Sequence, residues 1–152
     1  MSKREMSVVL KAIDLLAVAA CVLVLALVIP AIEARDVVPS GSTLAFALGV
    51  APLMALAVVS WTLFSAIGEG EVFSRNNARR LRSMGYLAAI DVLVWLAVTV
   101  AYVASADQIV FSVVASLSVA LVFCVSLAVV CVALSAFTEG AAQLKDENDL
   151  VV

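Results

Sequence analysis

The sequence predicts an all-α polytopic membrane protein, an antiparallel bundle of four transmembrane helices with both ends in the cytoplasm. The first observation is composition: 65% of the residues are hydrophobic and 14% are charged, whereas soluble domains are about half apolar and a quarter charged. The second is that the apolar residues fall in four long runs. The third is that almost all lysines and arginines flank one side of those runs.

Each run is long enough to cross a bilayer, because a transmembrane helix needs about 20 apolar residues. The predicted spans are Ala12–Ile32, Leu44–Ile67, Met84–Ala104 and Ile109–Phe137. Barrel strands are excluded, since they are shorter and alternate polar with apolar residues. Helices satisfy every backbone polar group internally, as lipid requires. Little chain remains outside the spans, so residues 1–152 form a single integral membrane domain.

Basic residues orient the predicted spans. Eight of the nine lie before the first span, between the second and third spans, or after the fourth, and only Arg35 lies in the other connections. Basic residues accumulate in the cytoplasmic loops of membrane proteins. We therefore expect a cytoplasmic N-terminus, a cytoplasmic loop at 68–83 and a cytoplasmic tail at 138–152. The expected location is a bacterial inner membrane.

The central loop is the most structured part expected outside the lipid. Gly68 and Gly70 suit a helix end, and Ser74 is typical of a helix N-cap. A helix is predicted to begin near Arg75 and to run into the third span. The fourth run is longer than a bilayer requires, so it must tilt or project into the cytoplasm.

Small residues recur at four-residue spacing within the spans, which favours close helix packing in lipid. We expect these stripes to face other helices of the same bundle, with a homo-oligomeric seam as the alternative. The stripes are Ala47, Ala51 and Ala55; Ala97, Ala101 and Ser105; and Ser112, Ser116, Ala120, Cys124 and Ala128.

Asp91 is the most unusual residue, because it lies inside the third predicted span without a basic residue one turn away. A carboxylate at this depth is costly and must face protein or water. One interpretation is a proton, cation or ligand site. The other, which we favour, is a neutral carboxyl group hydrogen-bonded to a serine, threonine, tryptophan or tyrosine of a neighbouring helix. Asp14 has a simpler explanation in a local pair with Lys11.

No established catalytic or cofactor-binding pattern occurs. The chain has no histidine. Its three cysteines all lie within the spans, Cys21 in the first and Cys124 and Cys131 in the fourth. Phosphate-binding, dinucleotide-binding and zinc-protease motifs are absent from the sequence. We expect no enzymatic activity, no metal, no cofactor and no direct binding of nucleic acid.

Two segments resemble a known family. These are Gly70–Gly85, with the sequence GEVFSRNNARRLRSMG, and Gln143–Val152, with the sequence QLKDENDLVV. Together they are similar to the YoaS-like proteins, small bacterial four-span membrane proteins of unknown function. Members end in a tail like ENDLTV, in which a threonine stands where this chain has Val151. Genes of the family often neighbour a small helix-turn-helix regulator, so the resemblance implies a membrane partner of a transcription factor.

The predicted function is therefore regulatory: an Arg-rich loop and an acidic tail would be presented to a cytosolic partner. The candidate contact residues are Phe73, Asn77, Arg79, Arg82, Glu147, Asn148, Asp149 and Leu150. The same residues are consistent with docking of the tail onto the loop, and the arginines with a collar that binds lipid headgroups. The alternative function is a small transporter or channel, or an accessory subunit, that uses Asp91.

Overall fold

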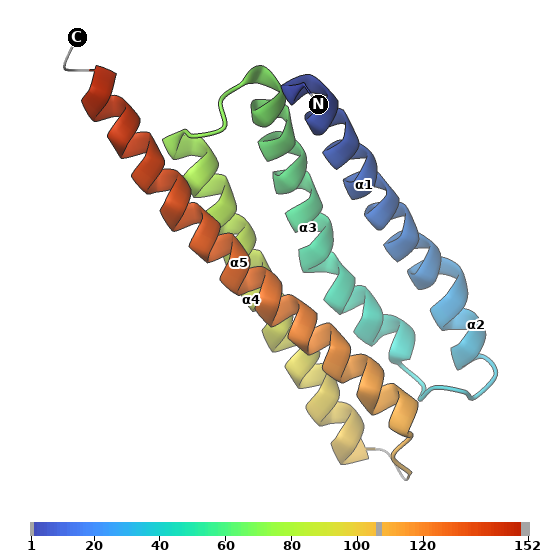
Figure 1. The fold of residues 1–152 in the computed structure, drawn as a ribbon. Helices are drawn as coiled ribbons and strands as arrows, with labels where there is room; N and C mark the ends of the chain where they lie inside the picture. Colours follow the sequence, from blue (N-terminus) through green and yellow to red (C-terminus); the bar gives the residue numbers. More distant parts are fainter. Residues whose placement is uncertain (1, 106–107, 150–152) are drawn as a thin grey trace.

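The computed structural model describes residues 2–105 and 108–149, and within them it is all-helical (Figure 1). The first rod consists of α1 (Lys3–Leu23), a π-helical segment η1 (Val24–Val28) and α2 (Ile29–Glu33). It is followed by α3 (Ser42–Glu69), α4 (Arg75–Ser105) and α5 (Phe111–Asp149). All four rods are long and apolar enough to cross a membrane. The predicted all-α fold with four helices able to span a membrane is confirmed, and the chain is a multi-pass membrane protein.

The π-helical segment has a local cause in Pro30. A proline lacks the backbone N–H and its ring clashes with the carbonyl of the residue four positions earlier, here Ala26 in the middle of η1. A wider π turn relieves this clash without breaking the rod. Pro52 lies within α3, which also continues past it. Membrane helices tolerate such prolines, because neighbouring groups and local adjustments satisfy the freed carbonyl.

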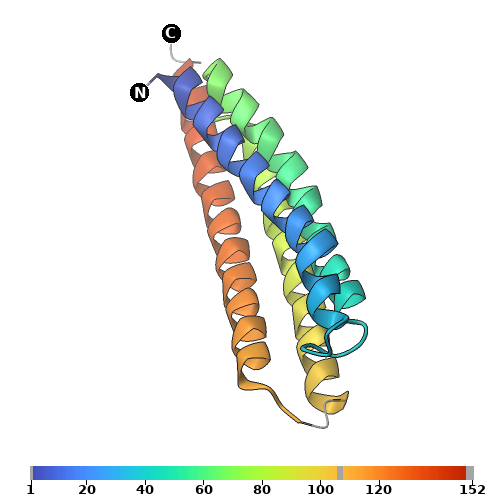
Figure 2. The same ribbon diagram turned by 90° about the vertical axis from the view of Figure 1, so that its right-hand side faces the viewer.

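The four rods pack in chain order. The first rod packs against α3, α3 against α4, and α4 against α5, whereas the described residues give the first rod no packing against α4 or α5. Figure 2 shows the result as an open bundle with α5 on one side. The start of α1, the α3–α4 loop and the end of α5 lie at the same end of the molecule (Figure 1). We call this the basic end.

Small residues bring α4 and α5 close together. A Cβ atom added at Gly85 would lie 2.8 Å from Cγ2 of Val132, so a larger residue at this crossing would force the Val132 side chain to move. The buried residues recur every seven positions, as Leu81, Ala88, Trp95 and Tyr102 on α4 and Leu117, Cys124, Cys131 and Thr138 on α5. A seven-residue repeat keeps one seam facing the partner along the whole length of two helices.

The predicted small-residue stripes do not form this seam. Ala97, Ala101, Ser105, Ser112 and Ser116 are all exposed, and of the predicted members on α5 only Cys124 is buried. The reason is geometric: steps of four residues turn by about 400° in a helix of 3.6 residues per turn, so such a stripe drifts steadily around the helix. Close packing by small residues was predicted correctly. On α5, Cys124 is buried and Ala120 packs against the buried cluster as expected, whereas the exposed members of the stripes were chosen wrongly.

The predicted Lys11–Asp14 pair is also absent. The ammonium of Lys11 lies 5.2 Å from the ring centroid of Trp61, and Asp14 accepts a hydrogen bond of 3.0 Å from the hydroxyl of Ser60. Both side chains therefore connect α1 with α3. The contact of the Lys11 ammonium with an indole ring and the hydrogen bond of Asp14 with a buried hydroxyl are each more favourable than an exposed ion pair within one helix.

α5 extends beyond the predicted span. Its 39 residues cover about 58 Å at 1.5 Å each, which exceeds a hydrocarbon core of about 30 Å. Residues 138–149, predicted as a tail, continue the helix, and Thr138 and Ala142 are buried. Packing against α4 thus sustains the helix through Gly140.

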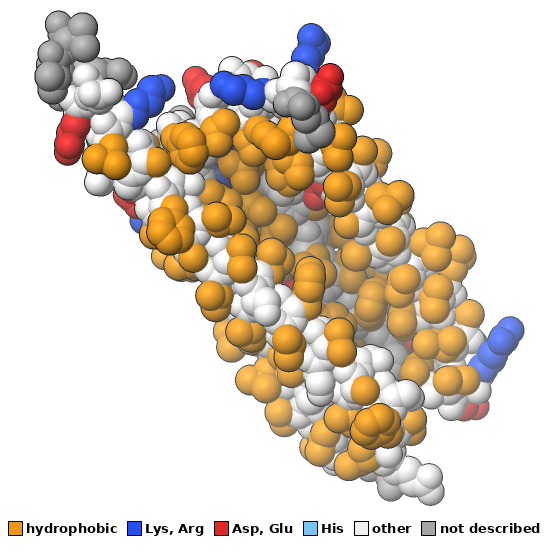
Figure 3. All heavy atoms as spheres, viewed as in Figure 1, with side chains coloured by type: hydrophobic (Ala, Val, Ile, Leu, Met, Phe, Trp, Pro, Cys, Tyr) orange, Lys and Arg blue, Asp and Glu red, His pale blue; other side chains and the backbone are white. Residues whose placement is uncertain are grey.

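Figure 3 shows the consequence for the surface: hydrophobic side chains cover the length of the molecule, and charged side chains gather at its ends. At the end opposite the basic end, the Glu33 carboxylate accepts hydrogen bonds from the backbone N–H groups of Gly41 (2.5 Å) and Thr43 (2.8 Å) and from the Thr43 hydroxyl. Glu33 thereby caps α3, whose own N-cap residue is a glycine without a side chain. The sequence reasoning missed this role.

Candidate functional site

The loop at the basic end is built as the sequence predicts. α3 ends at Glu69, and Gly70 adopts a left-handed conformation with φ of 91°, which glycine takes without strain. The Ser74 hydroxyl accepts a hydrogen bond of 3.2 Å from the backbone N–H of Asn77. Ser74 is therefore the N-cap, and α4 begins at Arg75 as predicted. Gly68, by contrast, lies inside α3.

Asn77 holds this loop together from within. Its side chain is 0% exposed and donates hydrogen bonds to the carbonyl oxygens of Glu71 and Val72. Its own oxygen accepts a hydrogen bond of 2.9 Å from the guanidinium of Arg80. Asn77 was predicted as a candidate contact residue, but its side chain is already occupied by the loop and does not reach the surface.

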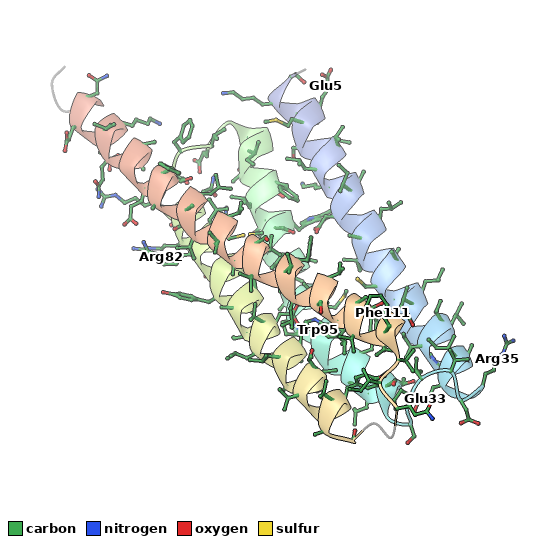
Figure 4. All side chains as sticks on the ribbon, turned by 60° about the horizontal axis from the view of Figure 1, so that its bottom comes forward. Glu5, Glu33, Arg35, Arg82, Trp95 and Phe111 are labelled. Carbon is green, nitrogen blue, oxygen red and sulfur yellow. The ribbon has the colours of Figure 1, made fainter. Side chains whose placement is uncertain are left out.

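Two ion pairs join α4 to α5 at the basic end. Arg75 lies 2.9 Å from Asp146, and Arg82 lies 2.6 Å from Glu139. All four side chains are at least 43% exposed, so each pair contributes about 0–1 kcal/mol. Acidic residues of the segment predicted as a tail therefore contact the arginines, as the docking interpretation expects, through Glu139 and Asp146. Figure 4 shows Arg82 on α4 beside α5.

The remaining contact candidates differ in exposure. Phe73 is 57% exposed, and Arg79 is exposed without an ion pair among the described residues. Glu147 and Asn148 are exposed on the last turns of α5. The side chain of Asp149 and the whole of Leu150 lie outside the described residues. The structure thus brings Phe73, Arg79 and the end of α5 to the same end of the molecule.

Asp91 lies in the α4–α5 seam. It is 0% exposed, and one carboxyl oxygen accepts a hydrogen bond of 3.2 Å from the Cys124 thiol. The other oxygen has no hydrogen-bond partner among the described residues. The donor lies on a neighbouring helix, as predicted, but it is a thiol and not a hydroxyl, and the side chain of Trp95 on the same helix as Asp91 also lies beside the carboxyl group. A thiol is a weak donor, so Asp91 is only partly satisfied, and the cost of burial favours its neutral form.

Metal binding finds no support in the part of the chain that the structure describes: histidine, cysteine, aspartate and glutamate side chains form no group of three there. Cys124 and Cys131 are buried on the same face of α5. Cys124 is next to one carboxylate only, and two such ligands are too few for a zinc site.

Comparison with known proteins gives one match. Residues 29–152 match the family model DUF2975, described as a protein of unknown function. The chain belongs to the DUF2975 family. No curated protein and no solved structure matches it.

The DUF2975 match covers α2 to α5, and with them the basic-end loop, both ion pairs and Asp91. All of α1 and η1 precedes it. The match supports the coarser part of the resemblance inferred from Gly70–Gly85, namely membership of an uncharacterised family. The description of the family names no partner and no activity.

In this DUF2975 chain, Asn77→Ala should destabilise the α3–α4 loop. The substitution leaves two backbone carbonyls and one guanidinium group without their partner, at a cost of about 1–3 kcal/mol per unsatisfied buried group. Thermal unfolding in detergent micelles should show a lower midpoint temperature. Asn76→Ala is the matched control, because Asn76 is exposed and exposed substitutions change stability by about 0.5 kcal/mol or less. Equal midpoints for the two variants would contradict the role assigned to Asn77.

Proposed function

We propose that this chain is a non-catalytic protein of the bacterial cytoplasmic membrane, with both termini in the cytoplasm, that presents its basic end to a cytosolic partner. The observation that carries the proposal is the charge layout: eight of nine basic residues belong to the segments that meet at the basic end. Basic residues mark cytoplasmic segments. A regulatory role is the one that fits a surface without catalytic groups.

The presenting surface consists of Phe73, Arg79, Glu147 and Asn148, all of them exposed. Phe73 offers an aromatic anchor and Arg79 a guanidinium group that no described acid engages. Aromatic residues and arginine dominate the energetics of protein interfaces. Arg82 has a different role. Its ion pair with Glu139 holds α5 beside α4 and so sets the geometry of the presenting surface.

A small helix-turn-helix regulator is the partner we propose, following the family resemblance. Such proteins carry a basic surface that contacts DNA phosphates. The last turns of α5 offer the exposed carboxylate of Glu147, which belongs to neither ion pair and complements a basic surface. Binding there would hold the regulator at the membrane and compete with DNA.

Arg79→Ala should weaken capture of the regulator at least about fivefold, the factor that corresponds to an interface residue worth 1 kcal/mol. Capture is measured by pull-down of the purified regulator on the protein in nanodiscs. Arg35→Ala is the control, because it removes the same charge from the opposite end, and it should capture as much as wild type. Equal capture by wild type and both variants would contradict the presenting surface.

Asp91 favours a second candidate function, a small proton or cation transporter or channel. The supporting observation is the fully buried carboxyl oxygen without a partner in the described chain, since intramembrane carboxyl groups commonly mark ion pathways. Proton or potassium flux into liposomes should then fall to background in Asp91→Asn and persist in Asp14→Asn. Wild-type liposomes that show no flux would contradict this function.

A further inference from the structure

A cavity lies at the basic end, between the last turns of α3 and the first turns of α4. It has a volume of about 240 Å³ and is open on one side. Polar and charged side chains predominate in its lining, which consists of Thr62, Ser65, Ala66, Glu69, Glu71, Asn76 and Arg80. Its place at the ends of two transmembrane helices puts it at the level of the lipid headgroups.

The charges in this cavity do not neutralise one another. Among the described residues, neither Glu69 nor Glu71 forms an ion pair, and neither does Arg80. One guanidinium nitrogen of Arg80 donates to the Asn77 side chain and, at 3.4 Å, to the carbonyl oxygen of Thr62. These bonds hold the guanidinium at the cavity and leave its other N–H groups available. The cavity lining therefore offers two anions and one fixed cation. The Lys3 ammonium lies next to Gly70, which separates the two glutamates in sequence, and among the described residues it forms no ion pair with either of them.

An apolar track leads away from the cavity along α3. Steps of three and four residues from Thr62 reach Val58, Ala55 and Ala51, which lie on the same helix face. All three are exposed, Val58 at 68%. Because two of them are alanines, whose side chains are short, little protrudes from the surface of α3 along this track. An acyl chain can lie there in direct continuation of the cavity.

We propose that the cavity binds the headgroup of phosphatidylethanolamine. The primary ammonium lies between the carboxylates of Glu69 and Glu71, the phosphate accepts hydrogen bonds from Arg80, and one acyl chain follows Ala51, Ala55 and Val58. The proposal goes beyond the presenting surface and does not depend on it, because it requires neither a cytosolic partner nor a particular orientation.

The chemistry distinguishes this lipid from its common alternatives. A primary ammonium has three N–H donors for carboxylates, and such charge-assisted hydrogen bonds are about twice as strong as neutral ones. The trimethylammonium of phosphatidylcholine has no donor. Phosphatidylglycerol has no cation and would place its negative charge beside two carboxylates.

Lipid retention tests the proposal. The full chain is reconstituted in bilayers of equal parts phosphatidylethanolamine, phosphatidylcholine and phosphatidylglycerol, extracted in mild detergent, and its retained lipids are counted by native mass spectrometry. Wild type should retain phosphatidylethanolamine in preference to both others. Glu69→Gln/Glu71→Gln should lower the ratio of retained phosphatidylethanolamine to phosphatidylcholine about fivefold, as expected for loss of an interaction near 1 kcal/mol at an exposed site.

Asp36→Asn is the control, since it removes an exposed carboxylate outside the cavity and should leave the ratio unchanged. Wild type that retains the three lipids equally would overturn the proposal, as would an unchanged ratio in Glu69→Gln/Glu71→Gln. Free phosphoethanolamine at millimolar concentration should not displace the lipid, because it lacks the acyl chain. Full displacement would overturn the assignment to a lipid and indicate a soluble phosphoamine instead.

Discussion

The hydrocarbon core of the bilayer dictates this structure: every backbone polar group must be satisfied within the protein, and charges must lie at the ends. Long helices meet the first condition, even at Pro30, where a π-helical segment keeps the rod continuous. The second condition is also met, because ionised side chains gather at the two ends of the rods. Asp91 is the exception, and its complete burial in the α4–α5 seam shows how unusual its position is.

α4 is the element on which the candidate sites converge. It packs against both α3 and α5, its first two turns carry Asn77 and the arginines of the basic end, and its middle carries Asp91. Gly85 lies between these two regions, where α4 packs against Ala128 and Val132 of α5. A shift of α4 against α5 would therefore alter the Arg82–Glu139 pair and the Asp91–Cys124 contact together.

Local features could be predicted from the sequence, and contacts between helices could not. Span positions, the Ser74 cap and the start of α4 at Arg75 depend on hydrophobicity and on side chains close in sequence. The partner of Asp91 and the partners of Lys11 and Asp14 depend on how each helix is rotated about its axis. Small residues are too frequent here to determine that rotation, which is why the exposed members of the predicted stripes were chosen wrongly. Burial of Asn77 was missed because its partners are backbone carbonyls of the preceding loop, which composition does not reveal.

Membrane orientation is the most direct test of the account, because the presenting surface has a cytosolic partner only if the basic end faces the cytoplasm. Phe73→Cys and Ser40→Cys, each in a background without the three native cysteines, place a thiol at exposed positions at opposite ends. A membrane-impermeant maleimide should label Ser40→Cys in intact cells and Phe73→Cys only after the membrane is permeabilised. Labelling of Phe73→Cys in intact cells, with Ser40→Cys protected, would contradict the account.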